Sequence, residues 1–191
     1  QAYRATGDMK YIERTARQMA CYLDRMQLPD GLFHHSAIAP FLWGRGNGWV
    51  AGGMPMLLGF LPESNPYRSR ILEAYRLMAS SLLKYQHGSG LWGQLIDAEE
   101  AWDESSCSGM FTSSLVLGVK NGWLDEDSYG AAARKAWTAL CAKIDSYGNV
   151  ADVGADTNCK NDRQFYLDRP RINGAPHGQA GLLWTVNALL G

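Results

Sequence analysis

The sequence lacks the patterns that mark nucleic-acid-binding and membrane-spanning proteins. Its 18 basic and 19 acidic residues give a formal net charge of −1. Proteins that bind nucleic acid or an anionic membrane surface usually concentrate lysine and arginine on one face, and no such cluster is present. No apolar run approaches the roughly 20 residues that a membrane-spanning helix needs. We therefore expect no nucleic-acid partner and no membrane partner.

Cysteine and histidine are few and irregularly spaced. The four cysteines form no CxxC pair, and the four histidines lack the spacing of metal ligands. We therefore expect no metal site. The cysteines are interpreted as small apolar side chains that stay reduced, which is typical of cytoplasmic proteins; disulfides would instead indicate a periplasmic or secreted protein.

The segment FLWGRGNGWV, residues 41–50, concentrates residue types that bind ligands. It is not a P-loop, because no GK[ST] follows, and no strand precedes it as in a dinucleotide-binding fingerprint. A tight turn before a helix would explain its glycines, but not why Trp43, Arg45, Asn47 and Trp49 crowd the same turn. An arginine fork, an amide and two indole faces at a helix N-terminus suit an anionic sugar. We interpret the segment as a binding site.

A long repeat organises the chain. Apolar residues spaced three and four apart predict amphipathic helices that start near Asp8, Asn65 and Asp125. Each helix is followed by a glycine, then by a polar loop and a second helix rich in small residues. The glycines recur at a period of about 60 residues, at Gly31, Gly90 and Gly148.

This period predicts an all-α chain of helical hairpins in a single domain. We place the hairpins at about 1–62, 63–122 and 123–191. The first helix of each is amphipathic, and the second, poor in charge, should be buried on most sides. The loops should gather at one end. Three such hairpins would form an arc rather than a closed ring.

Other loops carry further candidate residues. Glu104 occupies the position in the second hairpin that Arg45 occupies in the first. It could be a site carboxylate, a helix cap or a partner of Arg45. His34 and His35 lie shortly before Trp43 and could face the same pocket. The long last loop adds individually weak candidates, namely Tyr166, Asp168, Arg169, Arg171 and Asn173.

Three segments carry a resemblance to one enzyme family: DGLFHHSAIAPFLWGRGNGWV, GLWGQLIDAEEAWDESSCSGMF and NGAPHGQAGLLW. They resemble the C-terminal half of the unsaturated rhamnogalacturonyl and glucuronyl hydrolases, glycoside hydrolase families 105 and 88. The resemblance covers essentially the whole chain, and WGRGNGW is its most specific piece. It implies an (α/α)6 toroid of twelve helices.

The resemblance also implies a reaction. These enzymes hydrate the C4=C5 double bond of an unsaturated uronic acid at the end of an oligosaccharide, for example one derived from pectin. The hemiketal that forms collapses, opens the ring and releases the neighbouring sugar. An aspartate acts as general acid and base, and no metal or organic cofactor takes part. By matching position, the substrate would be lined by His35, Trp43, Arg45, Asn47 and Trp49, with Glu104 as a weaker addition.

The chain departs from the family pattern at two places. His35 and Trp43 are closer together than in many members, which leaves the substrate subclass open. The segment with the family's catalytic aspartate precedes the match to QAYRATGDMK, so the catalytic residue is expected upstream of Gln1. We therefore expect a fragment, inactive alone, that would be completed by an N-terminal half or by forming a homodimer.

Two other functions fit the same residues. One is a different sugar enzyme on the same toroid, such as a paired-carboxylate glycosidase or an epimerase, which would require Glu104 or another carboxylate. The other is a non-catalytic helical-repeat module whose tryptophan loops bind carbohydrate or a protein. Binding without turnover would distinguish this module from either enzyme.

Overall fold

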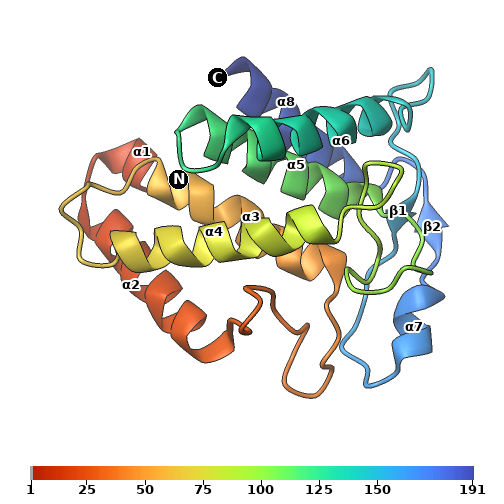
Figure 1. Ribbon diagram of the computed structural model, residues 1–191, viewed down its shortest axis with the longest axis horizontal. Helices are drawn as coiled ribbons and strands as arrows, with labels where there is room; N and C mark the ends of the chain where they lie inside the picture. The colour runs from red at the N-terminus through yellow and green to blue at the C-terminus, as the bar shows by residue number, and fades with distance from the viewer. Residues whose placement is uncertain (1) are drawn as a thin grey trace.

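The computed structural model describes residues 2–191 as two layers of helices (Figure 1). The outer helices are α2 (Lys10–Met26), α4 (Arg68–Lys84) and α6 (Ala131–Cys141). The inner helices are α3 (Gly44–Leu58), α5 (Ser105–Lys120) and α8 (Pro176–Leu190). The all-α class expected from the sequence is thereby confirmed.

Short elements complete the chain. A five-residue helix, α1 (Ala2–Thr6), precedes α2, and a π-helical turn, η1 (Glu126–Gly130), leads into α6. Between α6 and α8 lie β1 (Val153–Gly154), α7 (Arg163–Leu167) and β2 (Arg171–Ile172). The two strands pair antiparallel, Val153 opposite Ile172. They hold this long loop against the end of the inner helices.

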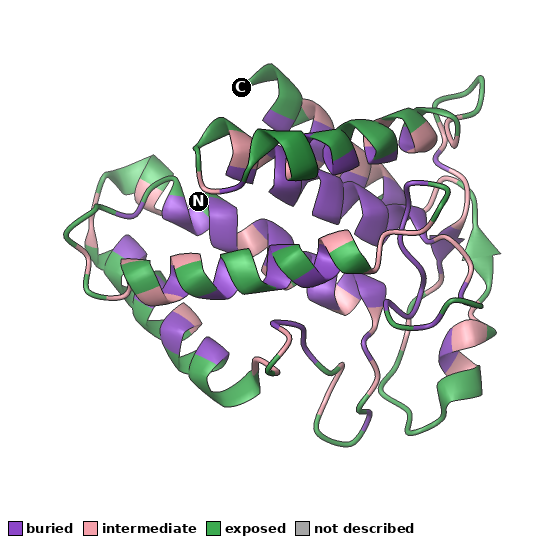
Figure 2. Ribbon diagram, in the orientation of Figure 1, coloured by how far each residue is buried: buried purple, intermediate pink, exposed green. Residues whose placement is uncertain are grey.

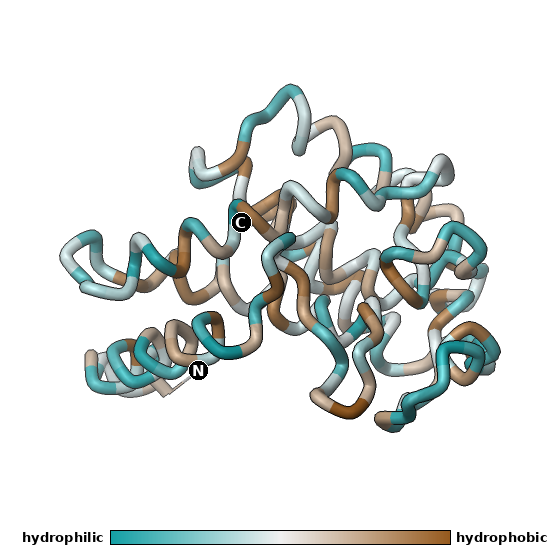
Figure 3. Tube along the Cα trace, turned by 60° about the horizontal axis from the view of Figure 1, so that its bottom comes forward, coloured by the Kyte–Doolittle hydropathy of each residue, from teal (hydrophilic) through white to brown (hydrophobic). Residues whose placement is uncertain are grey.

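The outer helices bury one face each, as their apolar spacing predicts. In α2 the buried residues are Ile12, Ala16, Ala20 and Leu23, which share one side of the helix. Hydrophilic and hydrophobic residues alternate along the helical turns in Figure 3. The helix α4 packs on α3, and α6 packs on α5. The outer helices α4 and α6 thus each cover the inner helix that precedes them in the chain.

The inner helices run parallel and approach very closely. Gly44 of α3 lies against Cys107 of α5, so the two helices begin side by side. Where α5 crosses α8, a Cβ built on Gly109 would come within 2.6 Å of the carbonyl carbon of Gly181. The Thr185 hydroxyl of α8 donates a hydrogen bond across this crossing to the Gly109 carbonyl, at 2.8 Å. Nearly all of α5 is buried (Figure 2).

The three repeating glycines serve the same structural purpose. All have positive φ, +87° at Gly31, +96° at Gly90 and +82° at Gly148, a conformation that side chains with a Cβ rarely adopt. Each glycine turns the chain after an outer helix and sends the next residues into the core. Phe33, Trp92 and Val150, two positions later in each case, are buried.

We expect Gly31→Ala to destabilise the protein several times more than Gly148→Ala. Both changes force alanine into a left-handed conformation that costs about 1–2 kcal/mol. At Gly148 the new Cβ meets nothing within 4 Å, whereas at Gly31 it would lie 2.6 Å from the backbone nitrogen of Met78 in α4. Urea unfolding of the two variants measures the difference. Equal losses would show that α4 moves aside at no cost.

Candidate functional site

Loops from all three repeats gather at the end where the inner helices begin. The Gly44 amide at the start of α3 donates to the Gln94 carbonyl at 2.9 Å, and the Ser105 amide at the start of α5 donates to the Asp152 carbonyl at 2.9 Å. The first turns of α3 and α5 and the strand β1 are therefore held together. This end of the molecule contains all six site residues expected from the sequence.

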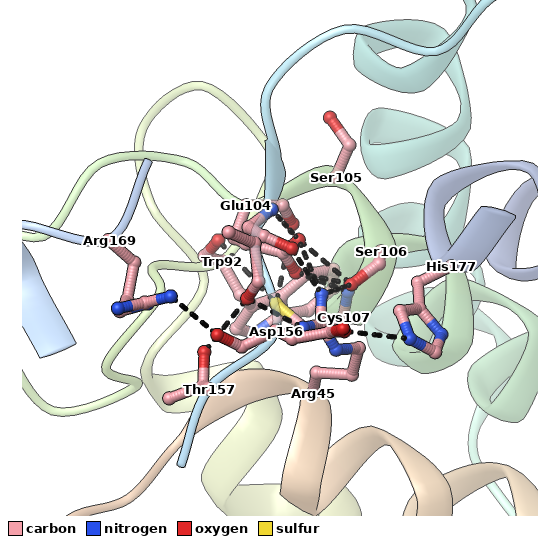
Figure 4. Close-up of polar contacts among 12 residues, drawn as sticks. Arg45, Trp92, Glu104, Ser105, Ser106, Cys107, Asp156, Thr157, Arg169 and His177 are labelled. Atoms are coloured by element: carbon pink, nitrogen blue, oxygen red, sulfur yellow. Dashed lines mark hydrogen bonds and ion pairs between the residues drawn. The ribbon is translucent and has the colours of Figure 1, made fainter. Parts of the chain in front are cut away.

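Arg45 and Glu104 form a buried pair at the centre of this end (Figure 4). The Arg45 guanidinium is 2% exposed and lies 3.7 Å from the Glu104 carboxylate. It donates to the carbonyls of Gly154 and Ala155, at 2.8 and 3.0 Å, and to the Ser106 hydroxyl at 3.3 Å. Two of its hydrogen bonds thus go to β1 and to the residue that follows it.

Glu104 caps α5 from the same buried position. Its carboxylate accepts from the backbone amides of Cys107 and Gly154, at 2.7 and 2.8 Å, and from the Ser106 hydroxyl at 2.8 Å. The positive end of the α5 dipole adds to the stabilisation of this negative charge. Of the alternatives that the sequence left open, the contacts are those of a helix cap and of a partner to Arg45. Before Arg45 or Glu104 could contact a sugar directly, it would have to break some of these hydrogen bonds within the protein.

Asn47 is also buried and bonds only to backbone. Its side-chain oxygen accepts from the Phe33 amide at 2.9 Å, and its side-chain nitrogen donates to the Phe33 carbonyl at 2.9 Å. A second bond from this nitrogen reaches the Trp43 carbonyl at 3.1 Å. Asn47 therefore ties the loop segment at Phe33 to the first turn of α3.

The glycines of GRGNG do not form the tight turn expected ahead of the helix. Residues 44–48 are already the first turns of α3, and none of the three glycines has positive φ. Their role is close packing instead. A Cβ on Gly44 would lie 2.7 Å from the Cys107 sulfur, and one on Gly48 would lie 2.6 Å from the Met110 sulfur. Any side chain at either position would push α3 away from α5.

His35, Trp43 and Tyr166 form an aromatic cluster next to the buried pair of Arg45 and Glu104. The Nδ1 atom of His35 lies 2.6 Å from the Tyr166 hydroxyl, and its ring centroid lies 4.4 Å from that of Trp43. The Arg45 guanidinium carbon lies 5.1 Å from the centroid of the Trp43 ring. Both His35 and Trp43 are partly exposed. The structure thus places Trp43 and His35 at the rim and Arg45 below them.

Trp49 faces α8 and is 45% exposed. Its ring meets that of Trp184 edge-on, with centroids 5.5 Å apart, and lies 6.2 Å from the His177 ring. The Nε2 atom of His177 lies 3.6 Å from the Asp156 carboxylate (Figure 4). Asp156 and His177 are polar residues of this end that sequence reasoning missed, because neither occurs in a spacing that signals a site.

The remaining candidates of the last loop mostly brace the loop itself. The Arg169 guanidinium lies over the Phe165 ring, and that of Arg171 lies over the Trp102 ring, each at 4.7 Å. Asp168 and Asn173 also bond within the loop. Among residues 2–191, no three histidine, cysteine or acidic side chains are grouped so that they could hold a metal ion. No helix in the same range is long and apolar enough to cross a membrane.

We expect the protein to lose stability on acidification through His35. Burial lowers the pKa of His35 from its ordinary value of 6.5, so the unfolded chain takes up the proton first. The stabilisation is present above pH 6.5 and is lost as the pH falls below it. The melting temperature of His35→Gln should therefore fall less between neutral and mildly acidic pH than that of the parent. The exposed neighbour provides the control, since His34→Gln should keep the full pH dependence.

Comparison with known proteins assigns nearly the whole chain to one family of enzymes. The family model described as Glycosyl Hydrolase Family 88 matches residues 1–190. Over 118 residues the chain is 41% identical to an unsaturated 3S-rhamnoglycuronyl hydrolase of Formosa agariphila, which covers 59% of the chain and 31% of that protein. Over 180 residues it is 28% identical to the unsaturated rhamnogalacturonyl hydrolase YesR of Bacillus subtilis, covering 89% and 50%. The chain thus spans from 31% to 50% of the length of these curated relatives.

A shorter relative is matched almost throughout. The 24.9 kDa protein in the picA locus of Rhizobium radiobacter is 26% identical over 213 residues. The match covers 94% of this chain and 91% of that relative. A polypeptide with little beyond the three repeats therefore occurs among the relatives.

Solved structures confirm the fold. A protein of Salmonella enterica described as a possible member of the GH105 family superposes with a TM-score of 0.90 at 24% identity, over 99% of this chain and 52% of that one. The unsaturated glucuronyl hydrolase of Bacillus sp. GL1 gives a TM-score of 0.69 at 19% identity, over 99% and 54%. The chain has the fold of about half of this (α/α)6 toroid.

Proposed function

Because the chain belongs to glycosyl hydrolase family 88, we propose that it forms the sugar-binding half of an enzyme that hydrates unsaturated uronic acids at the ends of oligosaccharides. One observation carries the proposal. The buried Arg45–Glu104 pair fixes the WGRGNGW segment so that Trp43 and His35 lie together at the rim of the inner helices. The names of the relatives, unsaturated 3S-rhamnoglycuronyl and rhamnogalacturonyl hydrolases, favour a uronic acid attached to rhamnose.

In this proposal the chain binds and orients the substrate. The indole faces of Trp43 and Trp49 provide apolar platforms for sugar rings, and His35, held in place by the buried Tyr166, offers its other ring nitrogen to a sugar hydroxyl group. Arg45 acts as a positioning residue. Its charge is offset by Glu104, so it holds the WGRGNGW segment in place, and the N-terminal end of α3, which no side chain caps, supplies the positive potential that attracts the uronate carboxylate.

The reaction adds water across the C4=C5 double bond. A proton goes to C4 and the water oxygen to C5, and the hemiketal at C5 opens the ring so that the neighbouring sugar leaves. The general acid and base would come from the other half of the toroid. Residues 1–191 would then be one domain of three hairpins, 1–62, 63–122 and 123–191, and inactive alone. A preceding segment of a longer chain would supply the other half together with its general acid and base, whereas a second copy would complete the ring without supplying them.

A chimera tests the proposal. Residues 1–191 would be joined to the half of YesR that this chain does not match, and the loss of ultraviolet absorbance from the C=C bond of an unsaturated galacturonyl-rhamnose disaccharide would be followed. We expect the chimera to consume the disaccharide and the 191-residue chain not to. A chimera that folds and binds the sugar without consuming it would favour the non-catalytic binding module. Cleavage of a saturated disaccharide would favour the paired-carboxylate glycosidase.

Trp49→Ala in the same chimera tests the binding residues. Loss of an exposed aromatic platform should raise KM at least roughly tenfold and leave the melting temperature nearly unchanged, since the side chain is 45% exposed. Tyr147→Ala is the matched control, because Tyr147 is 89% exposed and has no part in the proposed site. An unchanged KM in Trp49→Ala would remove Trp49 from the substrate site.

A further inference from the structure

Gln94 is a fully buried side chain whose polar atoms have no partner. It is 0% exposed, and within residues 2–191 neither its side-chain oxygen nor its side-chain nitrogen forms a hydrogen bond. Such atoms are costly to leave unpaired, and buried polar groups in folded proteins are rarely left so. Gln86, earlier in the connection between α4 and α5, follows this rule. Its side-chain nitrogen donates to the carbonyls of Gly90 and Ala132, at 2.8 and 3.0 Å.

The Gln94 amide lies between the start of α3 and β1. The backbone carbonyl of Gln94 accepts from the Gly44 amide at 2.9 Å, and its side-chain oxygen would lie 3.0 Å from a Cβ placed on Gly154. Gly154 is the β1 residue that contacts the buried pair, because its carbonyl accepts from Arg45 and its amide donates to Glu104. The unpaired amide is therefore next to the centre of the candidate site.

The repeat gives Gln94 a counterpart in each of the other two hairpins. His35, Gln94 and Asp152 each follow the turn glycine of their repeat by four positions. The Nδ1 atom of His35 lies 2.6 Å from the Tyr166 hydroxyl, and the Asp152 carboxylate pairs with Lys143 at 2.6 Å. The position that carries a rim residue in the first repeat thus carries an amide in the second that has no partner among the described residues.

Unpaired polar atoms also occur beside Gln94. The indole nitrogen of Trp43 and the Nε atom of Arg169 are buried and have no partner in the part of the chain that the structure describes. Trp43 is a close neighbour, because its backbone pairs with that of Leu95. Arg169 belongs to the long loop after β1 and points toward Asp156 (Figure 4). Polar atoms are therefore unpaired both in this loop and at the start of the inner helices.

We propose that the Gln94 amide binds a hydroxyl group of the substrate's sugar ring and that the Trp43 indole N–H donates to the same ring, an assignment that rests on the proposed function. A primary amide accepts from one hydroxyl and donates to the next, which suits the neighbouring hydroxyls of a uronic acid ring. Both groups are covered in this conformation, so the loop after β1 has to shift before the sugar reaches them. Such a shift breaks no hydrogen bond of the Gln94 amide or of the Trp43 indole.

Gln94→Leu separates a binding role from a structural one. Leucine removes the unpaired amide and keeps a buried side chain, so the melting temperature should stay the same or rise. The dissociation constant of the unsaturated galacturonyl-rhamnose disaccharide, measured by isothermal titration calorimetry on the 191-residue chain, should rise roughly tenfold. Gln86→Leu is the matched control. The Gln86 amide is bonded within the protein, so this change should lower the melting temperature and leave the dissociation constant unchanged.

A lower melting temperature in Gln94→Leu overturns the assignment, because the amide would then be bonded within the folded protein. An unchanged dissociation constant overturns it as well, since the sugar would not contact Gln94. Both results leave the proposed function standing, because the parent chain still binds the disaccharide. A parent chain that does not bind the disaccharide contradicts the proposed function itself, and the assignment of Gln94 falls with it.

Discussion

Replacing Glu104 by alanine is expected to destabilise the protein by about 3–5 kcal/mol, the usual cost of leaving one member of a buried ion pair alone. The change leaves the Arg45 guanidinium, 2% exposed, without a counter-charge. It also leaves the amides of Cys107 and Gly154 without their acceptor. Urea denaturation measures the loss. Glu63→Ala serves as the control, because Glu63 pairs with Arg68 at 2.8 Å but is 89% exposed, and it should cost at most about 1 kcal/mol.

Two further variants separate the causes of this loss. Glu104→Gln keeps the shape and some acceptor capacity but removes the charge, so it should cost less than alanine and still leave Arg45 uncompensated. Combining Glu104→Gln with Arg45→Met should cost less than the sum of the single changes, because the second change removes the charge that the first leaves unpaired. Additive losses would mean that the two side chains act independently, contrary to their 3.7 Å separation.

Trp92→Ala is expected to cost a similar amount, about 3–5 kcal/mol, as for other large buried aromatic side chains. Trp92 is completely buried, and its ring packs edge-on against Phe111 with centroids 5.4 Å apart. Its indole N–H donates to the Leu82 carbonyl in the last turn of α4 at 2.7 Å. The change therefore leaves a cavity and an unsatisfied carbonyl between α4 and α5. Thermal and urea unfolding both measure the effect.

Trp92→Phe distinguishes these two contributions. Phenylalanine fills most of the cavity and cannot donate to Leu82, so the expected loss is closer to the roughly 1 kcal/mol of one hydrogen bond plus a smaller packing defect. If phenylalanine were as damaging as alanine, the bond to Leu82 and not the packing against Phe111 would dominate.

Much of the fold could be predicted from the sequence, because regularly recurring glycines and apolar residues spaced three and four apart indicate the repeat. Gly31, Gly90 and Gly148 occur at corresponding turns with positive φ, which few other residues tolerate. The start of α3 could not be predicted in the same way. Glycine disfavours a helix, so GRGNG indicated a turn. Glycine is required at positions 44 and 48 because Cys107 and Met110, far away in the sequence, leave no room for side chains, and the close packing of α3 on α5 outweighs the low helix propensity of glycine.

The site was predicted in part. Matching positions in the first two repeats indicated that Arg45 and Glu104 could be partners, and they form a pair. The depth at which this pair is buried could not be predicted from the sequence. Arg45 is covered by the carbonyls of Gly154 and Ala155. Every residue has a backbone carbonyl, so the residue types do not indicate which carbonyls will accept a hydrogen bond. The bond between His35 and Tyr166 was missed for a related reason, since it joins loops that only the tertiary fold brings together.

The burial of α5 on all sides has a consequence for how the molecule opens. In repeat proteins the terminal units fray before the central ones. The amide hydrogens of α5 should therefore exchange with solvent only when the whole chain unfolds, whereas those of α2 and α8 should exchange through local opening at the two ends of the arc.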